Sequence, residues 1–343
     1  MIIGIVTLNG YENYGNRLQN YALQQIIENI GFKAYTLWPV SFKQSFKYFL
    51  KILIPFKSKY KKNKALYLFS KKYIRTKYYI NINTKVANKY DYFICGSDQV
   101  WNCNFKTFNT KMFLEFSPKE KNIAYAASFG INKIEKKYED IYLKGLNNFK
   151  SISVRESEGK QIIQKLDKSL KVDAVLDPTL MIDKSVWNNI ASKPAADIPD
   201  KYILVYMLGK NNNIFEAIEK TAKEKNWIVI NLMNEKSQYY SIGPAEFLYL
   251  IKNAELVCTD SFHACVFSLI FNRSFVVFDR VNKNNDMSSR LETLLKKFRL
   301  DNRKFNGQYI TQDNIIHDYS NAYKILKEEQ DNSIKFLRES LDL

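Results

Sequence analysis

The chain has 343 residues, of which 46% are hydrophobic and 25% charged, and its formal net charge is +17. This composition excludes a disordered chain, and at roughly 100–200 residues per domain the length favours two domains. The charge is unevenly placed: residues 29–90 hold 15 bases and no acid, whereas the other 37 bases nearly balance the 35 acids. A nucleic-acid-binding surface spread over the whole molecule is therefore not expected.

The cysteines and the N-terminus restrict the class of protein further. The four cysteines form no CxxC pair and are too few for a disulfide framework, so we expect reduced, buried thiols at Cys95, Cys103, Cys258 and Cys265. With two histidines in the chain, a metal site is not expected. The first residues lack the basic region of a signal peptide. The sequence contains no run of eighteen apolar residues, the length that a membrane-spanning helix needs. These features predict a cytoplasmic protein.

Short apolar runs alternate with helical patterns in the first half of the chain. We expect strands at residues 2–8, 33–37, 92–95, 123–127, 152–154 and 172–176, and helices at 16–30, 135–149 and 156–166. Asp177-Pro178 ends the last of these strands. Residues 178–200 contain three of the seven prolines and are expected to form a linker.

The same alternation starts again after the linker. We expect strands at residues 202–208, 227–232, 255–258 and 274–278, helices at 213–225, 244–253, 262–271 and 288–298, and a charged helical tail from Asp318. Strands separated by helices of this length are typical of doubly wound parallel sheets. We therefore predict an α/β fold with two Rossmann-like domains facing a central cleft: residues 1–185, with a basic helical insertion at about 41–77, and residues 200–318, followed by a helical tail at 319–343.

The basic segment has a pattern of its own. Within residues 41–56, aromatic and aliphatic side chains recur at three- and four-residue steps beside a stripe of lysines, and residues 57–64 add five more lysines. This pattern is typical of a helix that lies on an anionic membrane, so residues 41–64 are a candidate membrane contact. The simpler alternative is a helix packed on the first domain with solvated lysines. An acidic or lipid-linked saccharide acceptor is a third explanation, and nucleic acid is not expected because no nucleic-acid-binding fold accompanies the lysines.

Two polar turns follow predicted strands of the first domain. The turn at residues 9–17 opens a helix, whose first N–H groups can bind an anion, but it lacks the GxGxxG pattern and a plain turn explains it equally well. The segment Cys95–Asn102 places Gly, Ser, Asp, Gln, Trp and Asn at the carboxyl end of a strand. Ligands bind at this edge of open α/β sheets, so we favour a site over a capped turn packed by Trp101.

A third polar turn precedes the predicted helix at 262–271. Ser261 is a natural N-cap residue, and His263 then falls in the first turn, where the helix favours an anion and an imidazole can donate a proton. A structural hydrogen bond is the simpler role for such a histidine. Because His317 in the tail is the only other histidine, an enzyme that needs an imidazole is expected to use His263.

Three arginines lie where they could bind a carboxylate or a phosphate. Arg155 follows a strand at the carboxyl edge of the first sheet, while Arg17 and Arg290 lie at helix starts. A charge at a surface helix end would be the simpler explanation. It fits Arg155 least, because strand ends are usually shielded.

Seven short motifs follow one another along the chain: Tyr14-Gly15-Asn16, residues 96–102, residues 126–130, residues 153–156, residues 176–180, Ser261-Phe262-His263 and Ser289-Arg290. In this order and spacing the chain resembles the polysaccharide pyruvyl transferase family, from about residue 3 to residue 295. The resemblance implies a two-domain fold like that of GT-B glycosyltransferases. It also implies phosphoenolpyruvate as the donor substrate, a sugar as the acceptor and a pyruvyl ketal as the product, with Arg155 and His263 holding and activating the donor. One departure is Ala264, where the family often has Gly.

The residue types suit this chemistry. Phosphoenolpyruvate carries a phosphate and a carboxylate, so we expect Ser261 and the N–H groups of Phe262 and His263 to bind the phosphate and Arg155 the carboxylate, with Arg290 also on the donor side. His263 would protonate the enol carbon before a sugar hydroxyl attacks. Asp260 would orient the imidazole or accept a proton from the acceptor. No cofactor or metal is required.

The first domain is expected to hold the acceptor, a sugar of a surface polysaccharide or of its lipid-linked precursor. Its hydroxyls would be bound by Asn16, Arg17, Asp98 and Gln99. Contact of residues 41–64 with the membrane would make the protein peripheral at the inner face. Two other functions stay open: a GT-B-like glycosyltransferase with a nucleotide sugar as donor, and a non-catalytic protein that binds membranes or polyanions through its basic segment.

Overall fold

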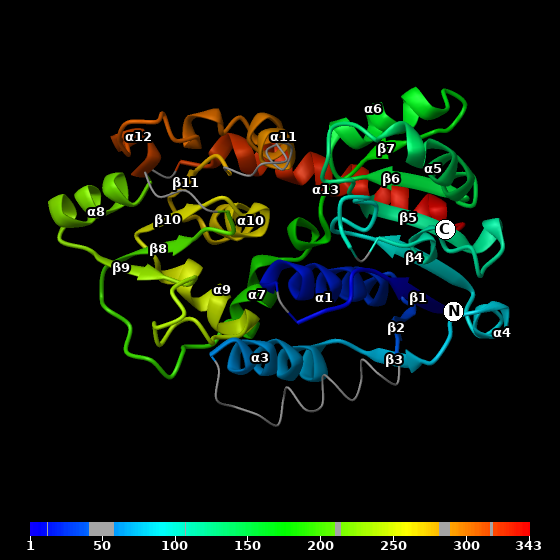
Figure 1. The fold of residues 1–343 in the computed structure, drawn as a ribbon, viewed down its shortest axis with the longest axis horizontal. Coiled ribbons are helices and arrows are strands. Elements are labelled where there is room, and N and C mark those ends of the chain that lie inside the picture. Colours follow the sequence, from blue (N-terminus) through cyan, green and yellow to red (C-terminus); the bar gives the residue numbers. More distant parts are fainter. Residues whose placement is uncertain (12, 41–57, 107, 210–213, 281–288, 316–317) are drawn as a thin grey trace.

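The computed structural model describes residues 1–343 except residues 12, 41–57, 107, 210–213, 281–288 and 316–317. Two sheets lie side by side, each with helices around it (Figure 1). The first has the strand order β3-β2-β1-β4-β5-β6-β7 and the second β11-β10-β8-β9, and every strand pairs in parallel with its neighbours. The predicted pair of Rossmann-like, doubly wound domains is therefore confirmed.

The strands lie close to their expected positions. Those of the first sheet are β1 (Ile2–Val6), β2 (Lys33–Pro39), β3 (Thr76–Tyr79), β4 (Tyr92–Gly96), β5 (Asn122–Ala127), β6 (Ser151–Val154) and β7 (Asp173–Ala174). Those of the second are β8 (Tyr202–Tyr206), β9 (Ile228–Asn231), β10 (Leu256–Thr259) and β11 (Phe275–Val277). Central strands such as β8 and β10 are buried along their whole length, as continuous apolar runs between two helical layers should be.

The α-helices of the described residues follow the same alternation. In the first half they are α1 (Tyr14–Asn29), α3 (Ser58–Tyr73), α4 (Thr84–Ala87), α5 (Glu139–Leu146), α6 (Ser157–Leu166) and α7 (Lys184–Ile190). In the second half they are α8 (Ile214–Lys225), α9 (Pro244–Asn253), α10 (Phe262–Phe271), α11 (Ser289–Phe298), α12 (Gln312–Ile315) and α13 (Ser320–Ser340). Every residue of α10 is buried, which suits a helix that is apolar on all sides and lies between the two sheets.

Three segments differ from the sequence-based expectation. The helix expected at 135–149 begins only at Glu139, where Glu139 and Asp140 provide the acidic first turn that favours a helix start. The strand expected at 172–176 ends at Ala174, because the backbone N–H of Leu176 donates to Ser333 Oγ on α13 and leaves the sheet. The expected linker at 178–200 contains α7, whose Trp187 is completely buried.

The basic segment is divided in the structure. The amphipathic helix expected at 41–56 lies outside the described residues. Residues 58–73 form α3, and residues 76–79 form β3, a strand that the sequence analysis did not identify. Helix α3 and strand β3 are therefore regular elements of the first domain, and β3 is the edge strand of its sheet.

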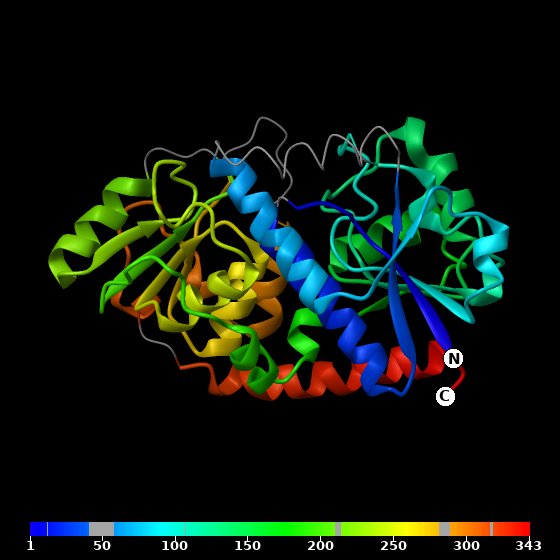
Figure 2. The same cartoon turned by 90° about the horizontal axis from the view of Figure 1, so that it is seen from below.

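The two domains share one apolar core. Tyr14 of α1 stacks on Phe247 of α9, with ring centres 4.7 Å apart, and Trp187 packs edge-on against Phe267 of α10. Helix α13 runs beneath both sheets, and the two chain ends lie close together (Figure 2). The four cysteines are buried and free, as expected. No helix of the described residues is long and apolar enough to cross a membrane.

Candidate active site

The first turns of α1 and α10 meet between the two sheets. The Asn13 side chain caps α1 by accepting from the backbone N–H of Asn16 at 3.2 Å. Gly15 lies in the same first turn of α1, and a Cβ atom added to it would lie only 2.1 Å from Nδ1 of His263. The imidazole of the second domain is therefore seated directly on the backbone of the first, at a position where only glycine leaves room for it.

Asp177 lies beside this imidazole and gathers groups from several elements. Its Oδ2 accepts hydrogen bonds from Ser97 Oγ and Arg155 Nη1, each at 2.8 Å, and lies 3.7 Å from His263 Nε2. Its Oδ1 accepts from the backbone N–H and hydroxyl of Thr179. Burial alone would raise the pKa of this carboxyl, but His263, Arg155 and the hydrogen bonds hold it well below its usual range. From the sequence, Asp177 was expected to end a strand and belonged to the motif at residues 176–180, without a role in the site.

Two buried arginines bring unused donors to the same region. Arg155 stacks on Phe262, with Cζ 4.3 Å from the ring centre, and its Nε and Nη2 have no hydrogen-bond partner among the described residues. Arg290 Nε likewise lacks a described partner. Burial and the like charge of Arg155 lower the pKa of Arg290 to about 10. Buried donors without partners are costly, so this cluster is suited to an anion such as a carboxylate or a phosphate.

Glu156, the last residue of the motif at residues 153–156, is a second carboxyl to which the sequence assigned no role. It is buried, accepts a hydrogen bond from Ser128 Oγ, and has Oε1 3.6 Å from Arg155 Nη2. Burial raises the pKa of Glu156, although Arg155 opposes the shift. The carboxyl thus partly offsets the charge of the neighbouring guanidinium without saturating its donors.

On the first domain, Asn16 and Asp98 form the other side of the site. Asn16 Nδ2 donates to Asp98 Oδ2 at 3.0 Å, and the backbone of Asp98 has a φ of 68°, a left-handed conformation that is rare outside glycine. Burial raises the pKa of Asp98, but Arg155, His263 and the Asn16 amide lower it further, so the net shift is downward. Asp98 is therefore close to Arg155 and His263. Gln99 lies next to it but accepts from Asn102 Nδ2 at 2.8 Å.

Arg17 is positioned differently from the expectation. It is completely buried, donates from Nη2 to the carbonyl of Leu8 at 2.6 Å and from Nε to Asn16 Oδ1 at 3.0 Å, and lies over the ring of Trp38. It has no exposed surface from which to contact a sugar. In this arrangement Arg17 orients Asn16.

Asp260 and Ser261 also make contacts that differ from those expected. The Asp260 carboxylate accepts from the backbone N–H groups of Leu208 and Gly209, at 2.6 and 2.7 Å, and from Arg280 Nε at 2.9 Å. The carboxylate beside His263 is instead that of Asp177. Ser261 occupies the N-cap position of α10, but its side chain makes no capping hydrogen bond. The helix start is thus left without a side-chain acceptor.

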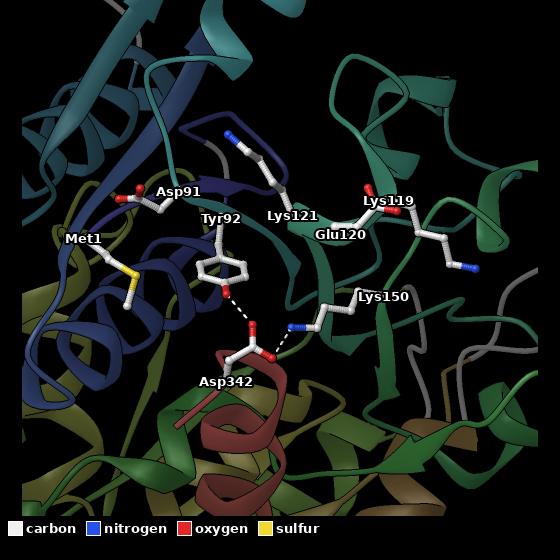
Figure 3. A pocket seen from close by; sticks show the side chains of 8 residues that line it. All are labelled: Met1, Asp91, Tyr92, Lys119, Glu120, Lys121, Lys150 and Asp342. Carbon is white, nitrogen blue, oxygen red and sulfur yellow. Dashed lines mark hydrogen bonds and ion pairs between the residues drawn. The ribbon is translucent and has the colours of Figure 1, made fainter.

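One hollow in the described residues lies at the site and another lies away from it. A narrow one is lined by residues of both domains, among them Arg155, Asp177, Phe262 and Arg290. A second hollow, of about 640 Å³, lies at the opposite end of the first sheet, where the strands begin (Figure 3). There Tyr92 and Lys150 both bind Asp342 and fasten the chain end to the first domain. None of the predicted site residues lines that second hollow, and no group of three or more His, Cys, Asp or Glu in the described residues is arranged to hold a metal.

Solved structures of very different sequence share the architecture. UDP-N-acetylglucosamine 2-epimerase from Rickettsia bellii aligns over 100% of this chain and 97% of its own, with 9% identity and a TM-score of 0.54. UDP-GlcNAc 2-epimerase from Neisseria meningitidis aligns over 99% of both chains, with 11% identity and a TM-score of 0.54. At these identities the likeness shows the fold alone. The fold is GT-B-like, as the sequence analysis expected.

The model of one protein family matches most of the chain. No curated protein matches the chain. The model of a family described as "Polysaccharide pyruvyl transferase" matches residues 13–282, well over half of the chain. The matched span contains Asn16, Asp98, Arg155, Asp177 and His263, which the structure gathers between the two sheets. The chain therefore belongs to the polysaccharide pyruvyl transferase family.

Proposed function

We propose that the protein transfers the pyruvyl group of phosphoenolpyruvate to two hydroxyls of a sugar, forming a ketal and releasing phosphate. One observation carries the proposal: unused donors of Arg155 and Arg290 gather beside His263 in a buried cluster between the domains, within a chain of this family. A small anion with two charged groups fits such a cluster because it would satisfy donors that are otherwise left without partners.

The donor side is assigned to the second domain and to Arg155. The carboxylate of the donor binds Arg155, whose Nε and Nη2 make no described hydrogen bond, and its phosphate binds the start of α10 with Arg290. The absence of a side-chain cap at Ser261 leaves the first N–H groups of α10 open to this phosphate. Asn16 and Asp98 receive the acceptor hydroxyls on the opposite side.

In the first half of the reaction, a sugar oxygen bonds to C2 of the enol while His263 delivers a proton to C3. In the second half, the C2–O bond to phosphate breaks, and a second sugar oxygen bonds to C2. The first hydroxyl gives its proton to His263, which replaces the one delivered to C3, and the proton of the second hydroxyl leaves with phosphate. We assign Asp177 as a positioning residue: at 2.8 Å from Arg155 Nη1 and 3.7 Å from His263 Nε2, it sets the distance between the donor-binding and proton-donating groups.

Ligand binding and transfer test the proposal together. Phosphoenolpyruvate should raise the melting temperature of the wild type, whereas uridine and guanosine sugars should not. Arg155→Ala should abolish the shift, and His263→Asn should keep much of it but abolish formation of pyruvylated sugar, detected by mass spectrometry with a panel of saccharide acceptors.

Arg75→Ala is a matched control, because Arg75 is half exposed and pairs with Glu28 at 2.8 Å, just before β3 and away from the site. It should behave as the wild type in both measurements. Stabilisation by a nucleotide sugar alone would instead favour the glycosyltransferase alternative, and near-normal turnover in His263→Asn would remove the assignment of the proton donor.

A further inference from the structure

Helix α3 has an outer face made almost entirely of lysines. We call this the α3 face: Lys61, Lys64, Leu68, Lys71 and Lys72, all of them exposed. At 3.6 residues per turn these five positions fall within roughly a third of the helix circumference. The opposite side of α3, with Leu66 and Phe69, is buried against the rest of the protein. The lysines are thus presented together on one surface.

The charge of the α3 face is not neutralised by its surroundings. No acid occurs between residues 29 and 90, and none of its four lysines forms an ion pair with another described residue. Helix α8 is a useful comparison. Its exposed lysines, Lys220, Lys223 and Lys225, alternate with the exposed acids Glu216, Glu219 and Glu224. A solvated helix of this protein can therefore mix both signs, and α3 does not.

An apolar side chain is exposed among these lysines. Leu68, in the middle of the α3 face, is 51% exposed. Elsewhere in the first domain, the edge strand β3 exposes Tyr78 (57%), and Ile80 just after it is 76% exposed. Aliphatic and aromatic side chains interleaved with lysines suit the headgroup region of a bilayer, which accepts both. A nucleic acid would use the charges but would leave these apolar groups without a role.

Helix α3 contacts both domains. It crosses from the first sheet toward the second domain (Figure 2). Its buried Lys62 lies over the ring of Tyr14 in α1, 4.6 Å from the centre, and over the ring of Tyr240 in the second domain, 5.1 Å from the centre. A surface bound to the α3 face would therefore lie alongside both domains, next to the region where they meet.

We propose that the α3 face binds the surface of a membrane rich in anionic lipid. Its four lysines lie near the headgroup phosphates, and Leu68 enters the boundary between headgroups and acyl chains. This contact is independent of the transfer reaction proposed above, since no residue of the face belongs to the active-site cluster.

Vesicle flotation with the full-length protein tests the proposal. The wild type should float with phosphatidylcholine vesicles that contain phosphatidylglycerol, but not with phosphatidylcholine alone, and high salt should release it. Each lysine near an anionic surface strengthens partitioning about fivefold, so Lys61→Gln/Lys64→Gln/Lys71→Gln should weaken it about a hundredfold. Leu68→Ser should weaken it several-fold at low salt, where the wild type is bound.

The matched control is Lys220→Gln/Lys223→Gln/Lys225→Gln, which removes the same charge from α8 and should float as the wild type does. Both triple variants are to be compared with the wild type by thermal melting, so that loss of folding is separated from loss of binding. The proposal is wrong if the wild type does not float, if the two triple variants float equally well, or if duplex DNA binds the protein more tightly than the anionic vesicles do.

Discussion

Replacing Gly15 by alanine is a sharp perturbation of the site, because it adds one methyl group at the contact between the domains. Gly15 is the second residue of α1, where alanine would ordinarily stabilise a helix by roughly 0.5–1 kcal/mol relative to glycine. Here the new Cβ would lie 2.1 Å from Nδ1, 2.3 Å from Cγ and 2.8 Å from Cβ of His263. The helical preference for alanine and the packing of the imidazole thus act in opposite directions.

The size of the clash sets the expected effect. An ordinary contact of a Cβ atom lies at 3.4–4 Å, so the methyl group and the imidazole must separate by more than 1 Å. Overpacking of this kind costs about 1–3 kcal/mol, which a folded domain commonly survives. A displacement of about 1 Å at a reacting group, by contrast, costs on the order of a hundredfold in rate. Gly15→Ala should therefore remain folded and lose most of its activity.

Measuring kcat for pyruvyl transfer together with the melting temperature separates the two effects. Gly10→Ala is the matched control, because a Cβ at Gly10 has nothing within 4 Å, and it should keep wild-type activity. If Gly15→Ala retains kcat within about twofold of the wild type while remaining folded, the seating of His263 on α1 does not matter for the reaction and the reasoning is refuted.

Three further predictions concern stability, each measured by urea unfolding. Asp177→Asn should lower the free energy of unfolding by about 3–5 kcal/mol at pH 7, because it removes the charge that compensates buried Arg155. Since folding lowers the pKa of Asp177, this difference between variant and wild type should be present above about pH 4 and shrink below it. A difference that does not change with pH would contradict the assignment. Burial lowers the pKa of Lys62 from 10.5 to about 8. As the pH rises from 8 to 10.5, the free energy of unfolding of the wild type should therefore increase by up to about 3 kcal/mol relative to that of Lys62→Met. A difference that stays constant over this range would exclude a buried ammonium. Trp187→Ala should cost about 3–5 kcal/mol if residues 178–200 belong to the core, and less than about 1 kcal/mol if they form a free linker.

The sequence predicts the fold well because the apolar pattern of this chain is regular. Buried parallel strands such as β8 and β10 appear as short continuous apolar runs between helices, and this pattern determines the sheet type. The pattern fails at α3, where Lys62 is buried on the apolar side and interrupts the helical stripe. With β3 missing from the expectation, residues 58–77 resembled an insertion.

The site could be predicted only in part. Arg155, His263 and Asp98 are candidates from the sequence because each follows the carboxyl end of a strand, where parallel sheets place their ligands. Asp177 carries the same signal, but its proline neighbour favoured a simple strand end. That Asp177 rather than Asp260 lies beside the imidazole depends on how the two sheets are placed relative to each other, which no local pattern encodes.

The contacts of Asp260 depend on strand order as well. Strand β10 pairs with β8, which brings the residues after β8 to the Asp260 carboxylate. Spacing along the chain cannot reveal such a pairing, because β9 and α9 lie between the two strands in sequence. The residue type and position of Asp260 were thus informative, whereas its partners were not.

Calorimetric titration of phosphoenolpyruvate tests the central claim most directly, namely that the cluster around Arg155, Arg290 and His263 holds this donor. The wild type should bind phosphoenolpyruvate at a single site, Arg155→Ala and Arg290→Gln should each lose this binding, and Arg75→Ala should keep it. Binding of a nucleotide sugar to the wild type, with phosphoenolpyruvate giving no heat, would contradict the account.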